Sequence, residues 1–304
     1  MAKIAYITRR FTADSREVIT KAEAICEQYA AEGYDLTLRQ LFYQFVARGW
    51  LPNTDASYDR LGSIINGARL AGLIDWDHLT DRTRNLASLP TWADPASIIE
   101  TAARQYREDK WAAQPEYVEV WVEKEALAGV VARPAERWQV PYFSCRGYVS
   151  QSEMHAAAQR IRHIEVHRGA KVTIVHLGDH DPSGLDMTRD IRDRLEMFGC
   201  RASVNRIALN MDQVERYQPP PNPAKLTDSR AADYIELYGP ESWELDALDP
   251  ATLDGLIDAE IQAHLDPEQW AADLAEEEEH QQGLVGVAAR WDAVQVWLEG
   301  EDAG

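Results

Sequence analysis

The chain has 304 residues, 45% of them hydrophobic, and a formal net charge of −20 at pH 7. This length predicts about two domains with sizeable cores. The first residues do not resemble a signal peptide, and no segment approaches the ~18 unbroken apolar residues of a membrane span, so we expect a soluble, cytoplasmic protein. Cys26, Cys145 and Cys200 are too few and too scattered for a disulfide framework or a zinc cluster, and we expect them to be reduced.

The negative charge is concentrated in the last third of the chain. Residues 1–110 hold 14 Lys and Arg against 15 Asp and Glu, and residues 111–210 hold 13 of each. Residues 211–304 hold 4 against 23. The net charge alone argues against a nucleic-acid partner, but the nearly neutral first two thirds can still bind DNA.

The first 110 residues predict a small helical domain. Apolar residues at helical spacing predict a helix over residues 14–31. Thr37 and Gln40 fit a capping box that opens a second helix, which ends near residue 48. A third helix is predicted over residues 57–71, and residues 72–80 are predicted to form a short hairpin. This order is typical of a winged helix-turn-helix domain, which binds DNA, although a helical domain that binds protein or nothing has the same pattern.

The third predicted helix carries polar side chains on its outer face. Asn66 lies on that face, and Arg60 and Arg69 flank it. In a DNA-binding domain these three residues are the candidate contacts of this helix.

Strands alternate with helices between about Pro115 and Leu209. We expect strands at residues 117–122, 142–145, 171–177 and 203–208, and helices at residues 126–131, 151–164 and 185–197. Such alternation implies a parallel sheet with helices on both faces, which is an α/β fold. With its separate helical domain, the chain as a whole is α+β.

From about residue 211 the chain is an acidic extension, and we expect it to be helical beyond the proline-rich residues 219–223. One helix is predicted to begin near Asp249 and Pro250. Another is predicted from the helical spacing of four apolar residues, Val287, Trp291, Val294 and Leu298. The run from Glu276 to Glu279 is predicted to be solvated and to have no chemical role.

Two of the predicted strands end in carboxylates. Asp179 and Asp181 follow the strand at residues 171–177, and both can point at one cation while His180 faces elsewhere. Glu123 follows the strand at residues 117–122. Because ligands bind beyond the carboxyl ends of parallel strands, the three acids predict a Mg²⁺ site that resembles the Toprim pattern of DNA and RNA enzymes. A turn that caps a helix is an equally good explanation of Asp-x-Asp-Pro-x-Gly taken alone.

Four blocks of sequence resemble, in the same order, the signature blocks of the topoisomerase VI A-subunit family, which includes the meiotic protein that makes programmed DNA double-strand breaks. The blocks are Leu38–Tyr43, Val122–Ala126, Arg146–Tyr148 and Asp179–Gly184. The similarity spans roughly residues 37–209, with a weaker echo at 225–248. It implies a compact family member, with a winged-helix domain in residues 1–110 and a Toprim domain in residues 111–304 that includes the acidic extension.

The resemblance also implies roles for individual residues. Tyr43 falls on the family's attacking tyrosine, and the metal-binding acids fall on Glu123, Asp179 and Asp181. Arg39, four residues before Tyr43 on the same helical face, is a candidate to steady the phenolate or to hold the scissile phosphate.

Each of the basic and aromatic candidates has an ordinary structural alternative. Tyr43 is surrounded by apolar residues and can be a core aromatic, and Arg39 can pair with a surface acid. Lys124 can contact phosphate or merely flank the end of a strand, and Arg146 is a further candidate contact to DNA. Gln40 stands where the family usually places an acid, which leaves open how the tyrosine hydroxyl loses its proton.

The implied function is a Mg²⁺-dependent DNA transesterase that links Tyr43 to the 5′ side of a broken strand. The family acts on double-stranded DNA as a homodimer, with the tyrosine of one protomer facing the metal of the other, so we expect a nucleoid-associated homodimer. Its topoisomerases need an ATPase subunit; this chain has no phosphate-cradling glycine loop, so we expect a separate ATPase partner or a role as a break-maker. A hydrolytic Toprim nuclease and a DNA-binding module with a vestigial site are the alternatives.

Overall fold

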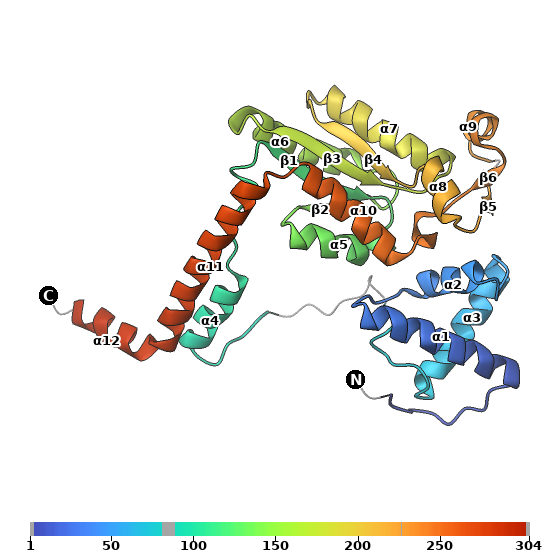
Figure 1. The fold of residues 1–304 in the computed structure, drawn as a ribbon, viewed down its shortest axis with the longest axis horizontal. Helices are drawn as coiled ribbons and strands as arrows, with labels where there is room; N and C mark the ends of the chain where they lie inside the picture. Colours follow the sequence, from blue (N-terminus) through green and yellow to red (C-terminus); the bar gives the residue numbers. More distant parts are fainter. Residues whose placement is uncertain (1–2, 81–88, 226, 302–304) are drawn as a thin grey trace.

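The computed structural model describes residues 3–80, 89–225 and 227–301, and at its centre is a parallel β-sheet with helices on both faces (Figure 1). The strand order is β2-β1-β3-β4. The strands are β1 (Glu116–Val122), β2 (Tyr142–Ser144), β3 (Lys171–Leu177) and β4 (Ser203–Ala208). All residues but the first are buried in β1 and β3, because helices cover both faces of a parallel sheet. The α/β class predicted for this part of the chain is confirmed.

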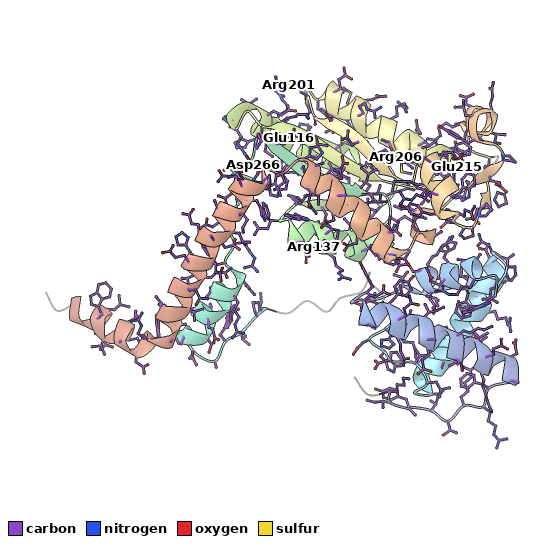
Figure 2. All side chains as sticks on the ribbon, viewed as in Figure 1. Glu116, Arg137, Arg201, Arg206, Glu215 and Asp266 are labelled. Atoms are coloured by element: carbon purple, nitrogen blue, oxygen red, sulfur yellow. The ribbon has the colours of Figure 1, made fainter. Side chains whose placement is uncertain are left out.

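Two pairs of helices enclose the sheet. On one face lie α5 (Ala128–Arg137), which follows the short 3₁₀ helix η1 (Glu125–Leu127), and α10 (Pro250–Ala263). On the other face lie α6 (Gln151–His167) and α7 (Pro182–Met197) (Figure 1). Arg137, labelled in Figure 2, pairs with Asp254 at 3.2 Å and also with Asp258, so it joins α5 to α10.

The first three helices form a bundle with its own apolar core (Figure 1). They are α1 (Ala13–Ala31), α2 (Leu38–Ala47) and α3 (Asp55–Leu70), and each begins and ends within two residues of its predicted bounds. At the start of α2, Thr37 and Gln40 each accept a hydrogen bond from the backbone amide of the other, so the predicted capping box is present.

The prediction of a hairpin at residues 72–80 is wrong. Instead of pairing with each other, the two ends of this region pair elsewhere, since Ala71 bridges Ala5 and Leu79 bridges Leu36. The guanidinium of Arg69 explains the difference, because it donates to the carbonyl oxygens of Trp76 at 2.8 Å and of Leu79 at 2.9 Å. The segment therefore folds around the guanidinium of Arg69 as a loop.

A helical arm extends from the sheet (Figure 1). It consists of α4 (Pro95–Gln105), α11 (Pro267–Ala289) and α12 (Trp291–Glu301), with α4 packed against α11. The helix that we predicted from Val287 to Leu298 is thus two helices, which meet at Arg290.

The glutamate run at residues 276–279 lies on α11, and one of its members is buried. Glu277 is 4% exposed and pairs with Lys110, which is 1% exposed. It also accepts a hydrogen bond from the amide of Glu108 at 2.8 Å. The prediction of a fully solvated run is therefore wrong for Glu277, which anchors the arm to the segment after α4.

A connection between the sheet and α10 contacts both cores. It contains α8 (Met211–Tyr217), β5 (Asn222–Pro223), α9 (Ala231–Tyr238), β6 (Glu241–Ser242) and the 3₁₀ helix η2 (Leu245–Ala247). His180 bridges Trp243 at the end of the sheet, and Ala247 packs into the core of the helical bundle. The bundle is thereby held against the carboxyl ends of the strands.

The remaining sequence predictions concern cysteines and membranes. All three cysteines are buried and free, as predicted. Within the described residues, the helices are too short or too polar to cross a bilayer.

Candidate functional site

The ends of β1 and β3 bring the predicted acids to one edge of the sheet. Val122 pairs with Leu177 in parallel register, so Glu123 and the residues after Leu177 leave the sheet side by side. The amide of Asp179 donates to Oε2 of Glu123 at 2.9 Å. Asp181 accepts from the amide of Gly184 at 2.6 Å and so caps α7, which means that the helix cap considered as an alternative is also present.

Two glycines provide the space that this close approach needs. A Cβ atom at Gly178 would lie 2.9 Å from Oε2 of Glu123, and one at Gly184 would collide with the carbonyl oxygen of Asp179. The second clash involves backbone and cannot be relieved by turning a side chain. The glycine of Asp-x-Asp-Pro-x-Gly is therefore required by the packing of the acids themselves.

An open cavity of ≈ 860 Å³ lies beyond the strand ends, between the sheet and the helical bundle. Residues of the helical bundle and residues at the ends of the strands line it. All the catalytic and metal-binding candidates predicted from the sequence are among them: Arg39, Tyr43, Glu123, Lys124, Asp179 and Asp181. Asn222, Glu244 and Asp246 are among the other polar residues of the lining, and the sequence did not mark these three as candidates.

Lys124 lies among three carboxylates. Its Nζ is 2.9 Å from Oδ2 of Asp179, 3.1 Å from Oε2 of Glu244 and 3.0 Å from Oδ1 of Asp246. Burial by itself would lower the pKa of Lys124, but Asp246, Asp179 and Glu244 raise it above its usual value. Lys124 is therefore a fixed positive charge at the end of β1.

Arg39 and Tyr43 stand one helical turn apart on α2 and point into the same cavity. Nη2 of Arg39 lies 3.4 Å from the hydroxyl of Tyr43 and donates to both oxygens of Glu244 at 2.9 Å. Tyr43 is 2% exposed. Burial is the largest cause that raises the pKa of Tyr43. Asp246 and Glu244 raise this pKa further, while Arg39 opposes the rise. The hydroxyl of Tyr43 therefore stays protonated unless a base or more positive charge approaches it.

Burial also affects the acids at the strand ends. It raises the pKa of Glu123, and it raises the pKa of Asp179 to about 7, although Lys124 opposes the second rise. Asp179 is fixed from two sides, because Oδ1 accepts from the amide of Leu245 at 2.8 Å while Oδ2 faces Lys124. Two carboxylates in a poorly hydrated position are stabilised by a cation.

Arg206 on β4, labelled in Figure 2, holds the loop that carries these acids. It donates to the carbonyl oxygens of Gly178 at 2.8 Å and of Asp179 at 2.5 Å, and to the hydroxyl of Thr188 at 2.9 Å. Burial lowers the pKa of Arg206 to about 10, so it stays charged at neutral pH. Its hydrogen bonds fix the backbone of the loop, which makes it a positioning residue.

His180 faces away from the cavity, as expected. Its Nδ1 lies 2.9 Å from the hydroxyl of Tyr234, and its ring packs against Tyr238 and Trp243. Burial lowers the pKa of His180 to about 4, so the imidazole is neutral at pH 7.

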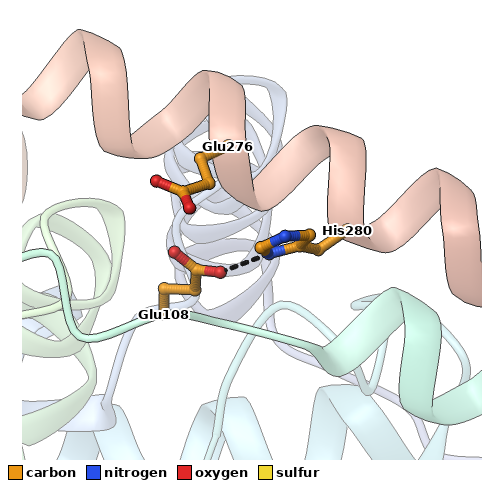
Figure 3. Close-up of side chains that lie close together, drawn as sticks. All are labelled: Glu108, Glu276 and His280. Atoms are coloured by element: carbon orange, nitrogen blue, oxygen red, sulfur yellow. Dashed lines mark hydrogen bonds and ion pairs between the residues drawn. The ribbon is translucent and has the colours of Figure 1, made fainter.

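The donor set at the strand ends fits a hard cation such as Mg²⁺, because it consists of carboxylate oxygens at an open cavity. Glu123, Asp179 and Asp181 do not converge closely, since Lys124 and backbone amides hold their oxygens. Among the residues that the structure describes, a tighter group is Glu108, Glu276 and His280, whose ligand atoms all lie within 4.8 Å of one another (Figure 3). Glu276 and His280 lie on α11 and Glu108 lies on the segment after α4, and the group is largely exposed. The contact of 2.6 Å between Nδ1 of His280 and Glu108 needs no metal.

Three of the predicted DNA contacts are held by neighbouring groups. Arg60 pairs with Asp14, Arg69 donates to the loop carbonyls and lies 4.4 Å from the ring of Trp76, and Arg146 pairs with Glu125 at 3.1 Å. Asn66 is exposed. Of the four candidates, Arg146 lines the large cavity, while Asn66 and Arg69 line a smaller one beside α2.

A weak sequence signal marked the two acids that were missed. Trp243-Glu244-Leu245-Asp246 alternates buried apolar residues with acids, much as the residues around Asp179 and Asp181 do. That pattern does not reveal its partner, because the bridge between His180 and Trp243 is a long-range contact.

Comparison with known proteins adds no further information. No protein-family model matches this chain, and no curated protein matches it. The resemblance to the topoisomerase VI A-subunit family is thus based on the four sequence blocks alone.

Proposed function

We propose that this protein is a Mg²⁺-dependent, DNA-cleaving transesterase of the topoisomerase VI A-subunit type, with a helix-turn-helix domain, in which a loop stands in place of the wing hairpin, followed by a Toprim domain. The observation that supports it most strongly is that Tyr43, Arg39 and the three acids Glu123, Asp179 and Asp181 line one open cavity. A phenol, a guanidinium and carboxylates are the groups needed to attack a phosphodiester, to hold it and to bind a neutralising cation.

In the proposed reaction, the hydroxyl oxygen of Tyr43 attacks the phosphorus atom of a DNA phosphodiester. The new bond joins this oxygen to phosphorus, and the bond from phosphorus to the 3′ oxygen breaks. The hydroxyl loses its proton and the 3′ oxygen gains one, which gives a 5′-phosphotyrosyl strand and a free 3′-hydroxyl. One ester replaces another, so the reverse reaction can reseal the strand without an external energy source.

The proton of Tyr43 needs an acceptor. Gln40, at the position where the family usually has an acid, is occupied by the capping box and has no acidic group. Two carboxylates lie nearby. Burial would raise the pKa of Glu244, but Lys124 and Arg39 lower it to about 2, whereas burial raises the pKa of Asp246. Asp246 is therefore the stronger base, and Arg39, 3.4 Å from the hydroxyl, would stabilise the phenolate.

Glu123, Asp179 and Asp181 would hold Mg²⁺, which supplies positive charge where negative charge builds on the phosphate. Because Mg²⁺ usually keeps several water molecules, the three carboxylates need not all contact it directly. Lys124, fixed between Asp179 and the segment of Glu244, adds a permanent positive charge at the same edge.

One observation favours the second candidate, a hydrolytic Toprim nuclease. Tyr43 is buried and its pKa is raised, which suits a packing residue as well as a nucleophile. In that case water would attack the phosphodiester, and the cut ends would be free of protein.

Retention of end-labelled DNA on a denaturing gel separates these candidates. With Mg²⁺, the parent and a Tyr58→Phe control, which alters another tyrosine of the same cavity, should form a covalent adduct. Tyr43→Phe should lose the adduct and keep its fold, because only one oxygen is removed. Free cut ends at the parent rate from Tyr43→Phe would establish hydrolysis, and DNA left intact by the parent would refute both reactions.

We also propose a homodimer that acts on double-stranded DNA, with a separate ATPase partner if strand passage is its task. Tyr43 lines the same cavity as Glu123 and Asp179 of its own chain, which supports a site built within one protomer rather than shared between two. Heterodimers of Tyr43→Phe and Asp179→Asn chains should then stay inactive. If the sites were instead shared between protomers, each heterodimer would have one intact site and would nick one strand.

A further inference from the structure

We propose that the carboxylate of Glu244 occupies an anion site that a DNA phosphate must take over before Tyr43 can react. The anion site itself follows from the contacts of Glu244. Its assignment to a DNA phosphate rests on the proposed function.

Glu244 is bound in the way that proteins bind phosphate oxygens. Nη2 of Arg39 donates to both of its oxygens at 2.9 Å, Nζ of Lys124 lies 3.1 Å from Oε2, and the amide of Asn222 donates to Oε1 at 3.1 Å. A guanidinium, an ammonium group and a side-chain amide around two oxygens form a general oxyanion site.

The site lies next to the proposed nucleophile. The same Nη2 atom of Arg39 that holds Glu244 is 3.4 Å from the hydroxyl of Tyr43. An anion seated where the Glu244 carboxylate now lies would therefore contact the group that also contacts Tyr43. Lys124 connects this position to Asp179, so the anion would lie between the tyrosine and the proposed metal ligands.

Glu244 can be reached and displaced from the cavity. Its side chain is 23% exposed and lines the open cavity. It belongs to a connection between β6, which has two residues, and α10, so it is not part of a long regular element. Its low pKa keeps it ionised throughout the neutral range.

The charge of the cavity explains why displacement is needed. Seven carboxylates and four cationic side chains line it, so a phosphate entering with Glu244 in place would be repelled. When Glu244 moves out, Arg39 and Lys124 become available to the phosphate. The connection that carries Glu244 thus acts as an internal competitor of DNA.

The test measures DNA binding rather than cleavage, by fluorescence anisotropy of a labelled duplex at low salt and without divalent metal. Glu244→Gln keeps the shape of the side chain and should tighten binding by roughly tenfold, the scale of one close charge contact. The control Glu241→Gln removes the same charge from an exposed neighbour outside the cavity and should change binding little. The gain in DNA affinity of Glu244→Gln should vanish when Arg39→Gln is combined with it. Equal or weaker binding by a folded Glu244→Gln protein would overturn the inference.

A second measurement uses the unaltered protein and does not depend on the variant folding. The amide of Leu245 donates to Asp179, so displacement of Glu244 by duplex DNA should speed hydrogen exchange at residues 243–248. Unchanged or slower exchange in the DNA complex would refute displacement. Failure of the proposed function has a different outcome, in which DNA binding and exchange change as expected but Mg²⁺ yields no covalent adduct.

Discussion

Two glycine substitutions are expected to change the free energy of unfolding in opposite directions, and together they test the packing of the candidate site. Gly184→Ala and Gly255→Ala both add one methyl group to a helix, in α7 and α10 respectively. At Gly255 nothing lies within 4 Å of the added atom, and Gly255 is exposed. Removing glycine from an exposed helix interior should stabilise the protein by about 0.5–1 kcal/mol.

At Gly184 the same methyl group meets backbone. It would collide with the carbonyl oxygen of Asp179 and lie 3.0 Å from its carbonyl carbon. This loop cannot shift easily, because Arg206 holds the same oxygen at 2.5 Å. Overpacking of this kind costs about 1–3 kcal/mol, so after the gain in helix propensity a net loss of about 1–2 kcal/mol is expected.

Urea unfolding measures both effects. The midpoint should fall for Gly184→Ala and rise for Gly255→Ala, with the slope of the transition unchanged. The proposed DNA cleavage should also be lost in the Gly184→Ala protein, because Asp179 would be displaced. A midpoint for Gly184→Ala at or above that of the parent would show that the loop yields and that our account of Gly184 is wrong.

Two further predictions concern histidines and the arm. Burial lowers the pKa of His176 to about 3, and a hydrogen bond with Glu108 raises the pKa of His280 above its usual value. The His176 contribution to stability is therefore present above pH 6.5 and falls as pH drops toward 3, whereas the His280 contribution is lost as pH rises above 6.5. In NMR titrations the His176 ring should not titrate down to pH 5. Glu108→Gln should lower the pH midpoint of the His280 titration. Titration of both rings over the same pH range would contradict these expectations. Glu277→Gln leaves the buried ammonium of Lys110 without its partner and should destabilise the arm by about 3 kcal/mol, while adding Lys110→Met should recover much of the loss in thermal unfolding.

The parts of the structure that the sequence predicted well are those set by local pattern. β3 begins and ends at the predicted residues because its mostly apolar, buried run is bounded by exposed Lys171 and by Gly178. β4 also has the predicted bounds. The capping box of α2 was recognisable because its two partners, Thr37 and Gln40, are three residues apart. The acids met at one edge because a parallel register places strand ends together.

The parts that could not be predicted depend on long-range partners. The burial of Glu277 depends on Lys110, which comes much earlier in the chain. The position of Glu244 in the cavity depends on the bridge between His180 and Trp243. The loop at residues 72–80 replaced the expected hairpin because the Arg69 guanidinium took up its carbonyl groups, and the spacing of turn residues does not reveal such a competitor.

The packing of α4 on α11 has a consequence for synthesis on the ribosome. The end of α4 at Gln105 precedes the start of α11 at Pro267 by roughly 160 residues. At translation rates of about 5–20 residues per second, α4 waits roughly 10–30 s for its partner. A single helix of 11 residues is marginal in water, so α4 should stay unfolded while the sheet assembles and should form only when α11 leaves the exit tunnel. Among the described parts of the chain, the arm is then the last to fold.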